Sequence, residues 1–150
     1  MALFGTVRAK RRDEAELGKG IWRRTHDRYV RGLDRYHQVL EMAEGELYDE
    51  LVVVANALAG GLPRVRALCT AAQRRFPSEG LDVPGGAAIA VHRRLSRAGN
   101  ALATTAEAAA MSCLDFDRWG IASANVENVR RRAEAVLEEI AAAEESADFS

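Results

Sequence analysis

The pair His37 and Glu41 comes nearest to a metal site in this sequence. The two residues stand four apart, so on a helix they share one face, and imidazole and carboxylate groups both bind transition metals. A di-metal helical protein needs a Glu-x-x-His motif on each of two helices and a carboxylate on each of the others. No Glu-x-x-His motif occurs in the sequence. We therefore expect no metal and no cofactor, with His37 in solvent or beside the core.

Catalytic motifs are missing as well. The sequence contains no Gly-rich phosphate loop, no Walker pattern, no Gly-x-Ser-x-Gly and no Cys-x-x-Cys. His26 falls in an apolar helical stripe, where a polar residue more often fixes register or oligomeric state than performs catalysis. His92 shares a stripe with Leu95, which predicts a partly buried, hydrogen-bonded imidazole. We therefore predict that the protein is not an enzyme.

A ridge of arginines is the strongest basic pattern. Its members follow one another at intervals of four, three and four residues, two residues out of phase with the apolar stripe: Arg24, Arg28, Arg31 and Arg35. Such a ridge can follow phosphate groups, but Asp27 and Asp34 are interleaved with it at helix pairing distance. We favour a solvated surface on which Asp27 pairs with Arg23 and Arg31 and Asp34 pairs with Arg31, and we expect no nucleic-acid partner.

The candidate interaction surface combines aromatic anchors with a second, less interrupted basic set. Trp22 and Trp119 each lie near an expected helix start, where the alternative is packing at the end of the helices. Tyr29 and Tyr36 would be left exposed on a long single helix, a patch that monomers rarely leave open. The basic set, which would meet an acidic partner, consists of Arg64, Arg66, Arg74 and Arg75.

The two cysteines and the hydropathy bear on the compartment. Cys69 and Cys113 fall on apolar helical faces, and without a secretory signal we expect both to be reduced core residues. No stretch approaches 18 consecutive apolar residues, which predicts no membrane-spanning segment. We therefore expect a cytoplasmic protein without integral membrane association.

Composition favours helix throughout the 150 residues, which is the size of one domain. Alanine occupies 28 positions and proline only 3. The net charge of −1 hides a blocky distribution: +5 over residues 1–40, −5 over 41–60, +5 over 61–100 and −6 over 101–150. Because neighbouring blocks cancel, the pattern suits intramolecular or self-association more than a ligand surface of one sign.

One long amphipathic helix is predicted from Ile21 to Leu58. Its apolar positions alternate between steps of three and four residues, with one slip near Leu47 that reads as a stutter in a coiled-coil seam. A helix of that length would be about 55 Å long and would need a cover.

Three further helices are predicted after Gly60-Gly61, which ends the long one. A short helix begins at Pro63 and stops before Pro77, and a loop follows over 77–86. A third helix runs from about Pro84 to Leu114, and a fourth starts near Asp115 or Asp117 and ends near Glu145. Residues 1–12 and 146–150 are expected to be loose tails.

The predicted fold is therefore all-α: an elongated bundle of three long helices and one short helix, with coiled-coil-like seams. Eight apolar residues of the seams are expected in the core: Leu33, Leu40, Leu47, Leu51, Leu95, Leu102, Val129 and Val136.

For the function we predict a small interaction or scaffold protein without catalysis, which forms a homodimer by antiparallel pairing of basic and acidic helix halves. The alternative is a binding module that holds a small or anionic ligand in a crevice between helices.

Overall fold

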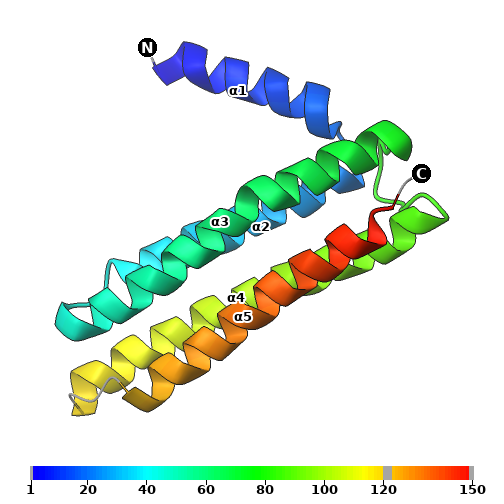
Figure 1. Cartoon of the computed structure of the whole chain (residues 1–150). Coiled ribbons are helices and arrows are strands. Elements are labelled where there is room, and N and C mark those ends of the chain that lie inside the picture. The colour runs from blue at the N-terminus through cyan, green and yellow to red at the C-terminus, as the bar shows by residue number, and fades with distance from the viewer. Residues whose placement is uncertain (1, 120–122, 149–150) are drawn as a thin grey trace.

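The computed structural model describes residues 2–119 and 123–148, with side chains over 5–119 and 126–148. Within these ranges the chain forms five α-helices and no strand (Figure 1). The helices are α1 (Ala2–Leu17), α2 (Ile21–Leu40), α3 (Gly45–Arg75), α4 (Ala87–Trp119) and α5 (Ser123–Ser146). The predicted all-α class is confirmed, whereas the predicted set of three long helices and one short helix differs from these five.

Helices α2 to α5 lie side by side and form what we call the four-helix body (Figure 1). Helix α2 returns as α3 and α4 returns as α5, so each sequential pair is antiparallel. The two pairs then stack with α2 against α4 and α3 against α5. Helix α1 is different, because it projects from the end of the body where α2 begins and α3 ends.

The predicted long helix over 21–58 is wrong, because the chain reverses direction in its middle. Helix α2 ends at Leu40, and the turn that follows is closed by hydrogen bonds from the backbone N–H of Met42 to Val39 and of Ala43 to Leu40. Gly45 then adopts φ +58°, a left-handed conformation that favours glycine. The slip near Leu47 therefore lies inside α3, just after the hairpin, and is not a stutter in one long helix.

The predicted helix end at Gly60-Gly61 is also wrong, since α3 continues through both glycines and through Pro63 to Arg75. The short helix predicted from Pro63 is therefore the C-terminal part of α3. A Cβ on Gly61 would collide with the Tyr29 hydroxyl and lie 2.9 Å from Cδ1 of Ile140. The glycine allows α2 and α5 to approach α3 here, and the packing outweighs its low helix propensity.

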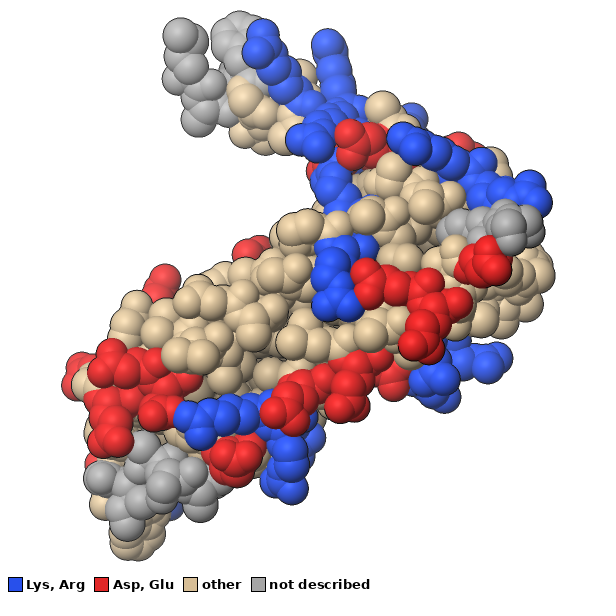
Figure 2. All heavy atoms as spheres, in the orientation of Figure 1, with Lys and Arg blue, Asp and Glu red and all other residues tan. Residues whose placement is uncertain are grey.

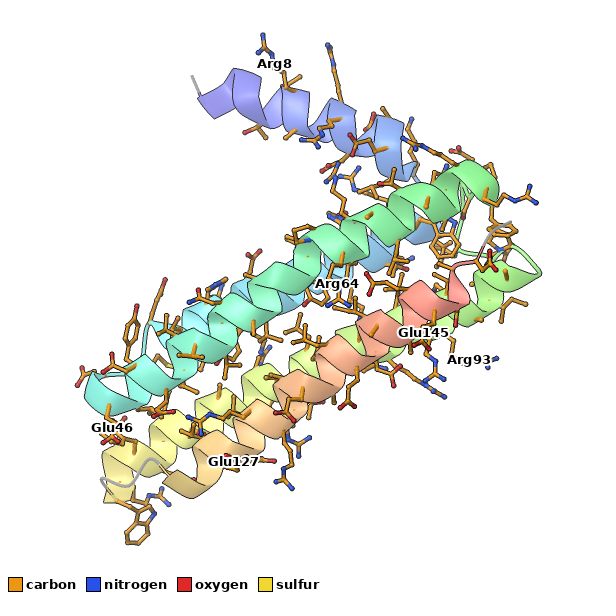
Figure 3. The ribbon with its side chains drawn as sticks, in the orientation of Figure 1. Arg8, Glu46, Arg64, Arg93, Glu127 and Glu145 are labelled. Carbon is orange, nitrogen blue, oxygen red and sulfur yellow. The ribbon has the colours of Figure 1, made fainter. Side chains whose placement is uncertain are left out.

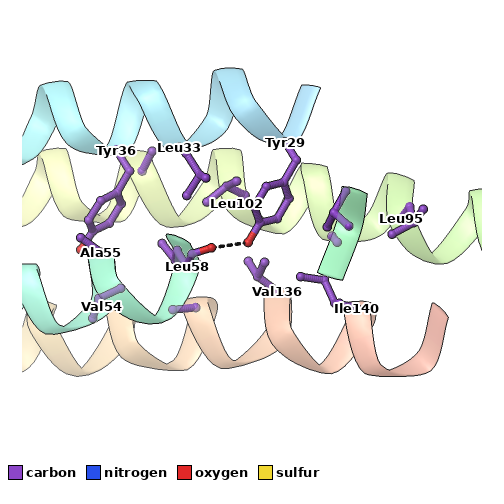
Figure 4. Packing of buried hydrophobic residues seen from close by; sticks show 14 of the residues in the cluster. Tyr29, Leu33, Tyr36, Val54, Ala55, Leu58, Leu95, Leu102, Val136 and Ile140 are labelled. Atoms are coloured by element: carbon purple, nitrogen blue, oxygen red, sulfur yellow. Dashed lines mark hydrogen bonds between the residues drawn. The ribbon is translucent and has the colours of Figure 1, made fainter. Parts of the chain in front are cut away.

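Two tyrosines of α2 fix its register against α3. The Tyr29 hydroxyl donates to the Leu58 carbonyl oxygen at 2.7 Å (Figure 4). The Tyr36 hydroxyl donates to the Leu51 carbonyl oxygen at 2.8 Å. The two tyrosines are seven residues apart on α2 and their acceptors are seven residues apart on α3 in the reverse order, which fits an antiparallel pair of helices. Both phenol rings are buried, so each hydroxyl needs such a partner.

The eight predicted core positions are all buried, with exposed fractions of 8% or less. Buried apolar residues from α2 to α5 meet along the axis of the body, where Leu102 of α4 and Val136 of α5 lie near Tyr29 (Figure 4). The helix ends were predicted less well: α4 continues through Asp115 and Asp117 to Trp119, and α5 begins at Ser123.

The loop between α3 and α4 holds the start of α2 in place. The Trp22 indole Nε1 donates to the Phe76 carbonyl oxygen at 2.9 Å, and the Ile21 backbone N–H donates to the Ser78 hydroxyl at 3.0 Å. Trp22 is fully buried. This aromatic residue is therefore a fold anchor that ties the start of α2 to the end of α3.

Helix α3 is long and apolar enough to cross a membrane by length and composition, with a mean hydropathy of 1.4 over its most apolar 18 residues. The sequence still has no run of 18 consecutive apolar residues, but α3 meets this looser criterion of length and mean hydropathy. The core helix of a soluble protein passes the same test, and one such helix is weak evidence for a membrane span. Helix α3 packs against α2 and α5 with ten buried residues, from Leu47 to Ala72.

Candidate functional site

Three aromatic members of the predicted interaction surface are buried in the chain's own core. Trp22, Tyr29 and Tyr36 are at most 2% exposed. The prediction that Tyr29 and Tyr36 form an open patch is wrong, because α3 folds back along α2 and covers both rings. Trp119, at the end of α4, is 68% exposed and stays available to a partner.

The predicted basic set divides into two engaged and two exposed arginines. Arg64 of α3 reaches α5, where its Nε donates to Oε2 of Glu144 at 3.1 Å (Figure 3). This hydrogen bond holds the pKa of Glu144 below its ordinary value. Arg66 binds carboxylates of α1, while Arg74 and Arg75 are exposed at the end of α3. The set therefore does not act as one patch.

Among the described residues, ion pairs and a buried leucine join the C-terminal end of helix α1 to the body. Arg66 Nη2 lies 2.8 Å from Oδ1 of Asp13 and 2.8 Å from Oε2 of Glu16, and Arg23 of α2 lies 3.8 Å from Asp13. Hydrogen bonds from Arg12 and Arg66 lower the pKa of Glu16. Leu17 is fully buried, so the last turn of α1 is held by both charge and apolar contact.

The preceding part of α1 is exposed on every side. All side chains over residues 5–12 are exposed, including Val7 at 43%. This stretch, expected to be a loose tail, is helical and carries Arg8, Lys10 and Arg11, which form no ion pair within the described chain (Figures 2 and 3). We call residues 5–12 the α1 arm.

The opposite end of the body is acidic. Around the turn between α2 and α3 lie four exposed carboxylates without an ion pair among the described residues, which we call the acidic tip: Glu41, Glu44, Glu46 and Asp49. Figure 2 shows red side chains gathered there, and Figure 3 labels Glu46 at that end. Neighbouring Glu50 is paired with Arg130 of α5 and is not part of the tip.

The arginine ridge of α2 borders a groove against α4. We call this surface the arginine groove; it consists of a hollow of about 530 Å³ and an adjoining hollow of about 220 Å³, which share Arg28 and Arg31. Small residues of both helices, Gly32, Gly99 and Ala103, line its floor. Sequence reasoning missed these floor residues, although Ser96, Gly99 and Ala103 follow helical spacing and signalled a small-residue face.

The predicted pairing within the ridge holds only at Asp27. Its carboxylate accepts from Arg23 Nε at 2.9 Å and from His26 Nδ1 at 2.9 Å, and it forms no ion pair with Arg31. Arg28 donates to the side-chain oxygen of Asn100 on α4. All four ridge arginines are exposed, as predicted, but they face a groove instead of open solvent on all sides.

The three histidines differ in their exposure. His26 is buried on Asp27, and His37 and Glu41 are both exposed. His92 is partly buried beside the Trp22 ring, at 6.2 Å between centroids, and burial lowers its pKa. Within the described ranges, no group of three or more His, Cys, Asp or Glu side chains is placed to hold a metal ion.

Both cysteines are free and buried, and burial raises the pKa of each thiol, to about 12 for Cys69. We expect a thiol reagent at neutral pH to label the folded protein about a hundredfold more slowly than the unfolded protein. The measurement is the rate of colour release from a disulfide reagent with and without denaturant. Rapid labelling of two thiols in the folded state would contradict this placement.

The charged surfaces are thus the α1 arm, the acidic tip and the arginine groove, each on a different part of the chain. The charged side chains of all three surfaces can form ion pairs, and the arginines of the groove can bind anions. No family model, no curated protein and no solved structure matches this chain.

Proposed function

We propose that this protein is a small interaction protein without catalytic activity that works as a homodimer, in which the α1 arm of each copy binds the acidic tip of the other. We also propose that α2 to α5 form an elongated bundle whose helices pack along coiled-coil-like seams. The observation that carries it is the α1 arm: two turns of helix whose side chains are all exposed and whose Arg8, Lys10 and Arg11 form no ion pair among the described residues.

A helix of this kind needs support from outside itself. Isolated helices shorter than about 12–15 residues are marginal in water, and most helices in proteins owe their stability to packing. Helix α1 is held to the body by its last turn, which lies beyond the arm, through Leu17 and the ion pairs of Arg66. A partner along the arm would supply the missing contacts.

Charge favours a second copy as this partner. The arm offers Arg8, Lys10 and Arg11, while the acidic tip lies at the opposite end of the body. A two-fold axis across the body would place each arm beside the partner's tip, which satisfies both sets at once. Surface ion pairs are worth only about 0–1 kcal/mol each, so they would mainly set orientation.

An apolar surface lies between these charges. From Val52 to Pro63, α3 carries no charged side chain, and Val53 is 65% exposed. Figure 2 shows a broad uncharged area on the side of the body that α3 covers. Burial of this area against its copy would supply the affinity that the ion pairs do not.

The test is a charge swap followed by light scattering. The wild-type protein is expected at about twice the chain mass of 16.4 kDa at micromolar concentration. The variant Arg8→Glu/Arg11→Glu, and separately Glu44→Lys/Asp49→Lys, should each raise the dimer dissociation constant about tenfold. Combining all four changes should restore association, because the complementary charges have changed places.

A control with an equal charge change is Arg131→Glu/Arg118→Glu, at exposed positions on α5 and α4. It should leave the dissociation constant unchanged. A monomeric wild type at high concentration, or a dimer indifferent to the arm variants, would reject the proposal.

A further inference from the structure

The arginine groove carries positive charge that the protein itself does not neutralise. Of the ridge arginines only Arg28 has a described partner, and that partner, the amide of Asn100, is neutral. Asp34 is the single acid among the lining residues of the two hollows. Because guanidinium groups stay protonated at any physiological pH, the groove has a net positive charge.

The spacing of these arginines suits several anionic groups in a row. Steps of three and four residues along α2 separate neighbouring arginines by about 4.5–6 Å, and Arg24 and Arg35 by about 16 Å. A single monovalent anion would occupy one guanidinium and leave the others unpaired. Phosphate matches the planar guanidinium fork with two parallel hydrogen bonds, which favours it over a spherical anion.

The shape of the groove depends on glycine. A Cβ on Gly99 would lie 3.3 Å from Cδ of Arg28, so the arginine stem rests directly on the backbone of α4. Gly32 and Ala103 keep the adjoining floor low. The arginines therefore border a hollow in which a ligand can lie between the helices, instead of forming a flat surface.

We propose that the arginine groove binds a ligand that carries two or more consecutive phosphate groups, held by Arg28, Arg31 and Arg35. Asp34 opposes part of this binding and limits its strength. The site lies between α2 and α4 and uses no residue of the α1 arm or the acidic tip, so it is independent of the proposed dimer.

The experiment is isothermal titration of the full chain with inorganic triphosphate at low salt. We expect one site per chain, about tenfold weaker binding for Arg31→Gln or Arg35→Gln, and tighter binding for Asp34→Asn. Both arginines are exposed and form no ion pair or side-chain hydrogen bond among the described residues, so both variants should fold. The matched controls are Arg118→Gln and Glu145→Gln, which change the net charge equally at exposed positions outside the groove.

Orthophosphate should bind at least about tenfold more weakly than triphosphate, since it spans one arginine. A nucleoside triphosphate is the second probe: tighter binding than inorganic triphosphate assigns the ligand to nucleotides, and equal binding assigns it to the phosphate chain alone. The proposal is overturned by no measurable triphosphate binding, by equal affinity for orthophosphate, or by an equal loss in Arg118→Gln.

Discussion

The folded protein should lose most of its stability between about pH 10 and pH 12, and Tyr29 and Tyr36 should be the main cause. Burial raises the pKa of Tyr29 from 10.0 to about 12 and raises that of Tyr36 as well. In the unfolded chain both phenols ionise near their ordinary value, whereas in the folded chain they stay protonated. The stabilising contribution is therefore complete below that value and is lost as the pH rises through the folded pKa.

The expected loss of folding free energy at high pH is large. A shift of two pKa units corresponds to about 2–3 kcal/mol for Tyr29, and Tyr36 adds a similar amount. Together they approach the total of about 5–15 kcal/mol that holds a typical domain together. Cys69 acts in the same direction, because burial raises its pKa from 9.0 to about 12.

Circular dichroism and tyrosine absorbance across a pH titration would measure this effect. The helix signal and the ionisation of the buried phenols should change together. The double variant Tyr29→Phe/Tyr36→Phe should move the transition to higher pH, although it loses two hydrogen bonds at neutral pH. Tyr48→Phe is the control, since Tyr48 is 42% exposed. Ionisation of all three tyrosines without loss of helix would show that these rings are not buried.

The spacing of apolar residues predicted the helical class and the core, because each turn of these helices places a residue in the interior. Leu33, Leu40 and Leu47 keep their interior positions although a reversal of the chain separates Leu47 from the others. The same apolar spacing continues through the hairpin, so it could not show that the chain turns back. The local signal was Gly45, whose φ of +58° favours glycine. The sequence alone does not show whether a glycine inside a helical pattern adopts a positive φ.

Tertiary contacts decided the remaining boundaries. Gly60-Gly61 before Pro63 is a typical helix end, yet α3 continues because Tyr29 and Ile140 pack against Gly61. The position of the arginine groove depended on the same kind of information. The exposure of the ridge arginines could be predicted, because they lie two residues out of phase with the apolar stripe of α2. That α4 lies beside them follows only from the way the two helix pairs pack, which the sequence does not show.

The effects of substitutions at Leu102 and Gly32 on the stability of the core should be strongly coupled. Leu102 is fully buried, and a Cβ on Gly32 would lie 2.7 Å from its Cδ2 and 2.8 Å from its Cγ. Leu102→Ala alone should lower the free energy of unfolding by about 2–5 kcal/mol, from lost burial and the cavity left behind. Gly32→Ala alone should also destabilise, because the clash of about 1–3 kcal/mol outweighs the helix propensity of about 1 kcal/mol that alanine brings.

When Leu102 is already alanine, Gly32→Ala should raise the free energy of unfolding instead of lowering it. Once Leu102 is shortened, the methyl group of alanine at position 32 enters the vacated space, and the better helix propensity is gained without a clash. Urea denaturation of all four proteins should therefore give a coupling energy of about 1–3 kcal/mol. Gly60→Ala is the control, since a Cβ there meets open space. It should raise the free energy of unfolding by about 1 kcal/mol whether position 102 is Leu or Ala. Additive effects of Gly32→Ala and Leu102→Ala would mean that α2 and α4 do not touch at this pair.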